Sequence, residues 1–299
     1  MVLYRKYRPK TFSQVVGQEH VTQTLQGALK TNSVAHAYLF TGPRGTGKTT
    51  IARLLAKAVN CENPQLGNGV SKLGSDACGV CGFCKEIEES KSLDLIEIDA
   101  ASNRGIDEIR ALREGARFAS ARGKHKIYII DECHQLTKEA SNALLKTLEE
   151  PPAKTIFILA TTEASKVLPT ISSRTQKFDF KKLNTEQVVA KLQSISLAEK
   201  IKIDESLLQL IALQSEGSMR DAERMLGKIS AAQDANITLG EGEEILGLPR
   251  REAMRQMFDF IGRADLKGAI ELLNRLYHDG YEMEYLNKML VAFFRDALF

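Results

Sequence analysis

The chain has 299 residues, of which 43% are hydrophobic and 26% are charged, and it carries a net charge of +3 with a pI of about 8.5. This is an ordinary soluble balance that allows two or three domains, and its mild charge neither requires nor excludes DNA. No apolar run approaches the roughly 18 residues of a membrane span, and the basic N-terminus has no apolar signal core. We therefore expect a cytoplasmic protein with no membrane partner.

The segment from Tyr4 to Val16 is basic and aromatic and turns apolar from Phe12 onward. Gly17-Gln18 breaks this pattern, and the periodicity then predicts a helix to about Lys30. A basic-aromatic arm just before a nucleotide-binding fold can pack on an adenine base. A solvated arm is the alternative, and the sequence leaves both open. The candidate adenine contacts are Tyr7, Arg8, Val15 and Val16.

A phosphate-loop motif, G-x-x-x-x-G-K-[ST], follows a short apolar run at 37–40, which predicts a buried strand, and precedes helical periodicity at 50–58. In this context backbone N–H groups and a helix N-terminus can surround an anion. Lys48 is then expected to reach the β- and γ-phosphates of ATP or ADP, and Thr49 to hold Mg²⁺ through its hydroxyl. The candidate nucleotide-binding residues are Gly42, Pro43, Arg44, Gly45, Thr46, Gly47, Lys48, Thr49 and Thr50.

The polar stretch 60–84 breaks the periodicity and contains four of the five cysteines, namely Cys61, Cys78, Cys81 and Cys84. Four thiolates can close a tetrahedral Zn²⁺ site, and the C-x-x-C spacing suits a tight knuckle. An iron–sulfur site or unliganded thiols are the alternatives, and no fourth cysteine follows Cys84 in the ferredoxin manner. Because no His, Asp or Glu is placed to join an open catalytic site, we interpret the metal as structural.

A strand is predicted at 93–99, a loop at 100–105, a helix at 106–119 and a second strand at 126–132. The second strand ends in Asp131 and Glu132, a Walker B pattern at the strand's carboxyl edge. Asp131 is expected to hold Mg²⁺, and Glu132 to orient or deprotonate the attacking water. A pair of helix-capping acids is the alternative. We expect Cys133 to face the core and His134 to be a local hydrogen-bonding residue rather than a ligand.

A helix is predicted at 138–150, stopped by Pro151-Pro152, and a buried strand at 155–162 that ends in Thr161 and Thr162. One of these hydroxyls can sense the γ-phosphate, although a threonine that caps the next helix is the alternative. A closing strand is predicted at 176–180. From about residue 184 the pattern is helical only, with helices at 184–199, 204–215 and 218–232 and three more between 249 and 299.

Arg220 lies in the first turn of the helix predicted at 218–232, where the helix dipole disfavours a cation. This placement suggests that Arg220 serves an anion outside the helix, with an ordinary surface arginine as the alternative.

Taken together, these motifs resemble AAA+ ATPases and, within them, the gamma/tau subunits of the bacterial DNA polymerase III clamp loader. The motifs that carry the resemblance are L-Y-R-K-Y-R-P-K-T-F at 3–12, V-V-G-Q-E-H at 15–20, H-A-Y-L-F-T-G-P-R-G-T-G-K-T-T at 36–50, the cysteine knuckle, I-E-I-D-A-A-S at 96–102, N-A-L-L-K-T-L-E-E-P-P at 142–152 and L-A-T-T-E at 159–163.

The resemblance implies roles for three further residues. Thr161 is favoured over Thr162 as the sensor 1 residue, and Arg220 corresponds to the sensor 2 arginine. Arg174 corresponds to the arginine of the family's S-R-C motif, which acts on the ATP of a neighbouring subunit. The motif here is S-R-T, and because the arginine carries the charge this departure changes little.

The resemblance also implies an α/β fold with a five-stranded parallel sheet. The expected domains are a nucleotide-binding domain at 1–180 with the zinc insertion at 61–84, a helical lid at 181–242 and the first part of a helical collar at 243–299. The implied function is that of an ATP-driven motor in a clamp-loader oligomer. Its partners would be delta, delta-prime and further gamma/tau copies, the sliding clamp, and primer–template DNA gripped through its phosphates.

Two other functions are alternatives to this one. Another AAA+ remodeller, such as a Holliday-junction motor, is disfavoured by the cysteine knuckle. A clamp-loader subunit that is only structural is disfavoured by the intact Lys48, Thr49 and the two Walker B acids.

Overall fold

The computed structural model describes residues 2–63, 76–231, 237–249, 251–281 and 283–298. The chain divides into two compact units. The first contains Leu3–Val188 and Ser215–Asp221, and the second contains Val189–Gln214 and the chain from Ala222 onward. Among the helices described, none is long and apolar enough to cross a membrane.

The first unit is built on a five-stranded parallel sheet with the strand order β2-β3-β4-β1-β5. Every residue of β1 and β4 is buried, as expected of apolar strands covered on both faces. The parallel α/β sheet predicted from the sequence is thereby confirmed. The strands are β1 (Ala37–Thr41), β2 (Leu95–Asp99), β3 (Lys126–Asp131), β4 (Thr155–Thr161) and β5 (Gln176–Asp179).

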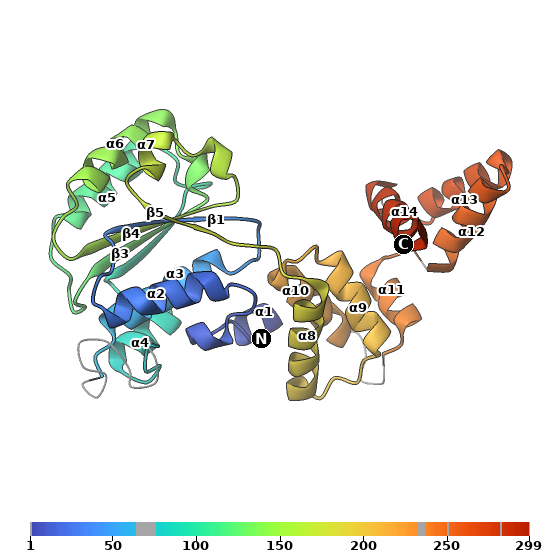
Figure 1. Cartoon of the computed structure of the whole chain (residues 1–299), viewed down its shortest axis with the longest axis horizontal. Helices are drawn as coiled ribbons and strands as arrows, with labels where there is room; N and C mark the ends of the chain where they lie inside the picture. Colours follow the sequence, from blue (N-terminus) through green and yellow to red (C-terminus); the bar gives the residue numbers. More distant parts are fainter. Residues whose placement is uncertain (1, 64–75, 232–236, 250, 282, 299) are drawn as a thin grey trace. The chain divides into compact units, whose positions relative to one another are not determined.

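Helices cover both faces of this sheet (Figure 1). Successive residues of β4 point to opposite faces, so Ile158 packs in one core while Leu159 packs in the other. One face carries α2 (Glu19–Lys30), α3 (Lys48–Asn60) and α4 (Gly82–Glu88), and the other carries α5 (Ile106–Ala116), α6 (Lys138–Glu149) and α7 (Pro169–Ser172).

Local capping explains several of the helix boundaries. Thr137 caps α6 by accepting a hydrogen bond from the N–H of Ala140 at 3.2 Å, and Pro151-Pro152 follows the end of that helix. Several short elements were not predicted from the sequence. They are α1 (Leu3–Lys6), α4, and the 3₁₀ turns η1 (Phe12–Gln14), η3 (Cys133–Gln135) and η4 (Ala164–Lys166).

From residue 184 onward the regular elements of the described chain are helices, as the sequence predicts. At the start of α8, Asn184 and Gln187 exchange side chain–backbone hydrogen bonds of 2.8 and 3.1 Å, the reciprocal pattern expected of this pair. The helix α11 was not predicted and is set by a capping box between Thr238 and Glu241. The helices are α8 (Thr185–Glu199), α9 (Glu205–Gln214), α10 (Met219–Ser230), α11 (Leu239–Leu246), α12 (Arg251–Gly262), α13 (Leu266–His278) and α14 (Met283–Leu298).

The last three helices share a small core of their own. Its buried members are Met254, Met257, Leu272, Leu276 and Leu286.

Candidate active site

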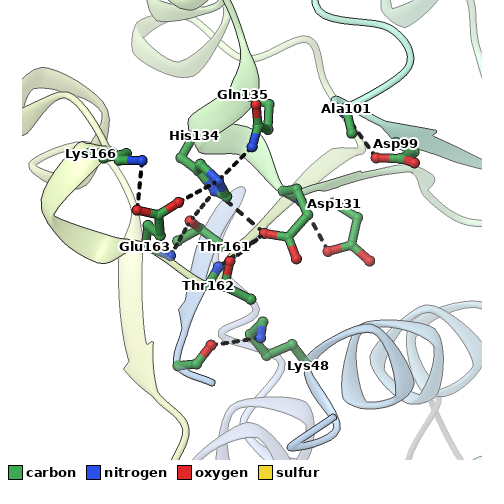
Figure 2. Close-up of polar contacts among 12 residues, drawn as sticks. Lys48, Asp99, Ala101, Asp131, His134, Gln135, Thr161, Thr162, Glu163 and Lys166 are labelled. Atoms are coloured by element: carbon green, nitrogen blue, oxygen red, sulfur yellow. Dashed lines mark hydrogen bonds and ion pairs between the residues drawn. The ribbon is translucent and has the colours of Figure 1, made fainter. Parts of the chain in front are cut away.

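Three motifs that are far apart in the sequence meet at the carboxyl edge of the sheet. Parallel strands end at the same edge, so the phosphate loop after β1, the acids at the end of β3 and the threonines at the end of β4 come together (Figure 2). The register places Thr41 opposite Thr161. The motifs predict a single site, and the topology shows why they converge.

The phosphate loop depends on glycines at two positions. Gly47 has a φ of 101° and directly precedes α3, a conformation that a side chain rarely adopts. A Cβ atom on Gly45, whose φ is 74°, would collide with the hydroxyl of Ser218. Thr46 closes the turn by donating its hydroxyl to the carbonyl of Pro43 at 2.8 Å. The loop therefore exposes backbone rather than side chains at the start of α3, where anions are favoured.

Lys48 begins α3 and is buried inside the loop. Its ammonium donates to the carbonyls of Gly42 and Pro43 at 2.7 and 2.8 Å. Burial lowers the pKa of Lys48, while the nearby carboxylates of Glu132 and Asp131 oppose this effect. The Lys48 ammonium can therefore leave these two carbonyls and pair with a phosphate group in the loop.

The side chains of Thr49 and Asp131 meet at the carboxyl edge of the sheet. The hydroxyl of Thr49 donates to Oδ2 of Asp131 at 2.8 Å, and Oδ1 of Asp131 accepts from the N–H of Glu132 at 3.0 Å. A hydroxyl beside a carboxylate is the donor set that suits Mg²⁺. The two residues that the sequence analysis assigned to this cation are therefore in direct contact.

Glu132 leaves β3 in a left-handed conformation, with a φ of 50°. Such backbone in a non-glycine residue is strained and is concentrated at functional sites. The carboxylate of Glu132 faces Thr162. Thr162 donates its N–H at 3.1 Å and its hydroxyl at 2.8 Å to Oε2 of Glu132. Thr162 is thus a partner of Glu132, a pairing that sequence reasoning missed.

Thr161 is fully buried at the end of β4. Its hydroxyl oxygen accepts from the N–H of Glu163 at 3.0 Å and lies 2.9 Å from Nδ1 of His134. His134 makes side-chain hydrogen bonds with its neighbours, as the sequence analysis expected, and Cys133 is buried in the core.

Basic and aromatic side chains of the N-terminal arm lie near Arg220. The guanidinium of Arg220 lies 5.2 Å from the ring centroid of Tyr4, a residue that the sequence analysis did not select. Burial lowers the pKa of Arg8, Arg53 adds to this effect, and Glu97 opposes it. Tyr7, Val15 and Val16 are partly buried, and the assignment of these three residues and Arg8 to adenine stays a prediction.

The four clustered cysteines form a compact group, as expected for a metal site. Their Sγ atoms all lie within 4.8 Å of one another, and Sγ of Cys84 is 4.0 Å from those of Cys61 and Cys78. Four sulfurs about 2.3 Å from a tetrahedral Zn²⁺ are separated by about 3.8 Å. Burial raises the pKa of Cys84, while the N–H groups of Cys78 and Cys81 donate to neighbouring sulfurs. The donor set and spacing fit a cation such as Zn²⁺.

Arg174 lies at the opposite edge of the sheet from the phosphate loop. It lies two residues before β5, which runs parallel to β1, so it is at the amino edge. Its Nε and Nη2 atoms contact Oε1 of Glu149 at 2.9 and 2.7 Å. Its Nη1 donates to the carbonyl of Thr170 at 2.9 Å and to the hydroxyl of Ser173 at 3.1 Å. The residues His36, Leu148, Glu149, Ser173 and Arg174 line a surface cavity here.

Over nearly its whole length the chain is similar to tau and gamma subunits of bacterial DNA polymerase III. A tau subunit of DNA polymerase III from Bacillus subtilis is 43% identical over 99% of this chain and 51% of its own length. The tau subunit of Escherichia coli is 42% identical over 95% of this chain and 43% of its own length. The gamma subunit of Buchnera aphidicola is 38% identical over 95% of this chain and 76% of its own length.

The chain belongs to the gamma/tau subunit family of bacterial DNA polymerase III. Residues 17–184 also match the family described as DNA polymerase III, delta subunit. The chain spans about half the length of the tau subunits it matches. This membership confirms the resemblance seen in the sequence motifs.

The fold is also similar to solved structures of another AAA+ protein. The Thermotoga maritima RuvB Holliday junction branch migration motor aligns with a TM-score of 0.58 over 85% of this chain and 79% of its own, at 17% identity. A likeness at this identity shows the AAA+ fold alone. The gamma/tau relatives, which are more than twice as similar in sequence, decide the family.

Proposed function

We propose that this chain is an ATP-driven motor subunit of the DNA polymerase III clamp loader, which loads the sliding clamp onto primer–template DNA. One observation supports this function most strongly. Lys48, Thr49, Asp131 and Glu132 converge at one edge of the sheet, with Thr49 and Asp131 in hydrogen-bond contact. A subunit with only a structural role would not need this set.

Each residue of the site has a proposed task. Lys48 binds the β- and γ-phosphates, and Thr49 and Asp131 hold Mg²⁺, which would neutralise charge on the phosphates. Glu132 orients and deprotonates the attacking water. Thr161 donates a hydrogen bond to the γ-phosphate. Arg220, placed beside the loop residue Gly45 and over Tyr4, binds the same phosphates from the lid.

Arg174 is proposed to serve the ATP of a neighbouring chain. The five residues of β1 separate the two sheet edges, and at about 3.3 Å per residue this is about 16 Å. An arginine side chain does not span that distance to its own phosphate loop. An arginine supplied in trans can stabilise the charge of the transferring phosphoryl group.

This arrangement requires an oligomer, and the helical region at 243–299 has a surface that suits one. Exposed apolar residues recur along α13 at Leu266, Ile270, Leu273 and Tyr277, so they form one stripe of the helix. Delta, delta-prime and further gamma/tau copies are the proposed subunits. The division into domains at 1–180, 181–242 and 243–299 is part of this proposal.

DNA contacts are proposed through phosphates and are therefore insensitive to sequence. The loop between β2 and α5 is a candidate, since Ser102 and Arg104 are exposed there. The amide of Asn103 is occupied within the loop, donating to the carbonyl of Asp99 at 3.1 Å.

The cysteine cluster is proposed to hold one structural Zn²⁺ between Cys61, Cys78, Cys81 and Cys84. Elemental analysis of protein purified without chelator is expected to give one zinc per chain. A Cys84→Ser variant is expected to lose the metal, whereas Cys133→Ser, in the core away from the cluster, is the matched control. Iron, or no metal, in the wild-type protein would overturn the assignment.

The decisive experiment for the function is ATP turnover with and without sliding clamp and primed DNA. We expect turnover to rise when both are present. Equal turnover with unprimed DNA and no clamp would contradict clamp loading. Stimulation by four-way junction DNA alone would favour a branch-migration motor, and a complete lack of turnover would favour a structural subunit.

A further inference from the structure

His134 occupies the centre of the candidate active site although none of the roles above uses it. It lies on the 3₁₀ turn that follows Glu132, and only 4% of its side chain is exposed. Its ring stands among residues from the ends of β3 and β4 (Figure 2). A buried imidazole between these strand ends can fix the position of one relative to the other.

The Nδ1 atom of this ring faces two residues with proposed roles in the reaction. It is 2.9 Å from the hydroxyl of Thr161 and 3.4 Å from Oε2 of Glu132. A carboxylate can only accept a hydrogen bond, so a proton on Nδ1 is favourable toward Glu132. The same proton is shared with the oxygen of Thr161.

The Nε2 atom faces a donor and a carboxylate. The amide nitrogen of Gln135 is 3.0 Å away, and Oε1 of Glu163 is 3.2 Å away. Glu163 also pairs with Lys166 at 2.7 Å, and this contact lowers the pKa of Glu163. Lys166 binds the other oxygen, Oε2, and so neutralises much of the charge of that carboxylate, and the amide of Gln135 lies nearer to Nε2 than Oε1 of Glu163 does. The amide of Gln135 can therefore donate to an unprotonated Nε2.

We propose that His134 is a positioning residue that carries its proton on Nδ1 and thereby aims the hydroxyl proton of Thr161 at the substrate phosphate while holding Glu132 beside it. The inference rests on the proposed ATPase function. It gives His134 a role in that function and specifies which ring nitrogen carries the proton. The substrate that Thr161 contacts is a nucleoside triphosphate.

The reason lies in the hydrogen-bonding capacity of a threonine hydroxyl, which accepts two hydrogen bonds and donates one. The oxygen of Thr161 accepts from the N–H of Glu163 at 3.0 Å and, with this tautomer, from Nδ1 of His134. Both acceptor positions are then filled, and the hydroxyl proton is available to a phosphate oxygen. With the proton on Nε2 instead, Thr161 would donate to His134 and turn away from the phosphate.

Two substitutions separate the two ring nitrogens. In His134→Asn the side-chain amide falls near the position of Nδ1, and in His134→Gln it falls near that of Nε2. We expect His134→Asn to keep kcat within about threefold of wild type. We expect His134→Gln to lower kcat by about 10- to 100-fold, because a hydrogen bond in a buried charged network is lost. The affinity for nucleotide should stay unchanged in both, and because each variant replaces the same buried ring, any fall in melting temperature should be similar in the two.

Equal losses of kcat in the two variants, or a fall in nucleotide affinity that parallels the loss of kcat, would overturn the proposal. A purely structural role for His134 would lower kcat in step with the melting temperature, by the same amount in both variants. If wild-type protein hydrolyses ATP but the variants behave alike, only the role of His134 fails.

A second measurement does not depend on turnover. The ¹⁵N chemical shifts of the imidazole of His134, assigned by comparison with His134→Asn, report which nitrogen carries the proton. We expect a protonated Nδ1 and an unprotonated Nε2 in the presence of a non-hydrolysable ATP analogue. A proton found on Nε2 alone would overturn the proposal, whether or not the protein hydrolyses ATP.

Discussion

The two edges of the parallel sheet are built in contrasting ways. At the carboxyl edge the phosphate loop, Asp131, Glu132 and Thr161 come from three strands and are joined by hydrogen bonds within one chain. At the amino edge a half-exposed Arg174 contacts only Glu149, Thr170 and Ser173 among its hydrogen-bonding and ion-pair partners in the described residues. The first edge gathers the residues proposed to bind the nucleotide, and the second presents a cation at the end of the sheet away from the phosphate loop.

In the proposed function, this difference lets one sheet serve two nucleotides. Strand direction alone places Arg174 a full strand length from the loop that its own chain offers. A charged group so placed is useful in the proposed reaction only when a second chain brings its carboxyl edge to it. Its ion pair with Glu149 also leaves the two side chains together with almost no net charge until the pair separates.

The largest expected effect is that of Arg174→Ala on turnover in the assembled complex. Loss of a cation that stabilises the transferring phosphoryl group should lower kcat by about 10³-fold. Nucleotide binding to the same chain should be unaffected, since the two edges are separate. Lys177→Ala, which removes an exposed cation from β5, is the control and should change little. A loss of nucleotide affinity in Arg174→Ala would place the arginine in its own chain's site.

Glu132→Gln is expected to have the next largest effect. The amide can still accept from Thr162 but cannot take a proton from water, so turnover should fall about 100-fold or more while ATP remains bound. Single-turnover kinetics with a filter-binding assay would measure both quantities. Turnover that stays within a few-fold of wild type would exclude Glu132 as the general base.

Lys48→Ala tests the carboxyl edge by binding rather than by chemistry. Removing a charge-assisted contact with the β- and γ-phosphates should weaken nucleotide binding by about 10- to 100-fold. Titration with a fluorescent ATP analogue would measure this, with thermal melting to verify folding. Affinity like that of wild type in a folded Lys48→Ala protein would contradict the assignment of the loop.

The smallest effect is expected for Glu149→Gln at the amino edge. Both partners of the ion pair are partly exposed, at 48% for Glu149 and 35% for Arg174. Such pairs contribute at most about 1 kcal/mol, so freeing Arg174 should raise turnover of the complex by no more than about fivefold. Glu150→Gln, at the neighbouring exposed position, is the matched control. A fall in turnover as deep as that of Arg174→Ala would instead mean that Glu149 orients the arginine.

The sequence predicted those parts of the molecule that rest on local signals. The parallel sheet follows from apolar strands alternating with helical periodicity, and the phosphate loop and the cysteine cluster follow from fixed spacings. The contacts of Thr162 with Glu132 and of Glu149 with Arg174 could not be predicted in this way. The first depends on the register of β3 and β4 and on a left-handed residue at 132, and the second depends on how α6 packs against α7. The helices α4 and α11 were missed because each is short and lies beside Gly-rich or Cys-rich sequence.

The central claim is that Arg174 completes the site of another chain, and mixing two inactive variants tests it most directly. Complexes made only from Arg174→Ala chains lack the arginine, and complexes made only from Lys48→Ala chains fail to bind ATP productively. In co-assembled complexes, an Arg174→Ala chain with an intact phosphate loop can lie beside a Lys48→Ala chain with an intact Arg174. We predict that ATP turnover reappears in such mixtures. Turnover that stays absent in complexes shown to contain both variants would contradict the account.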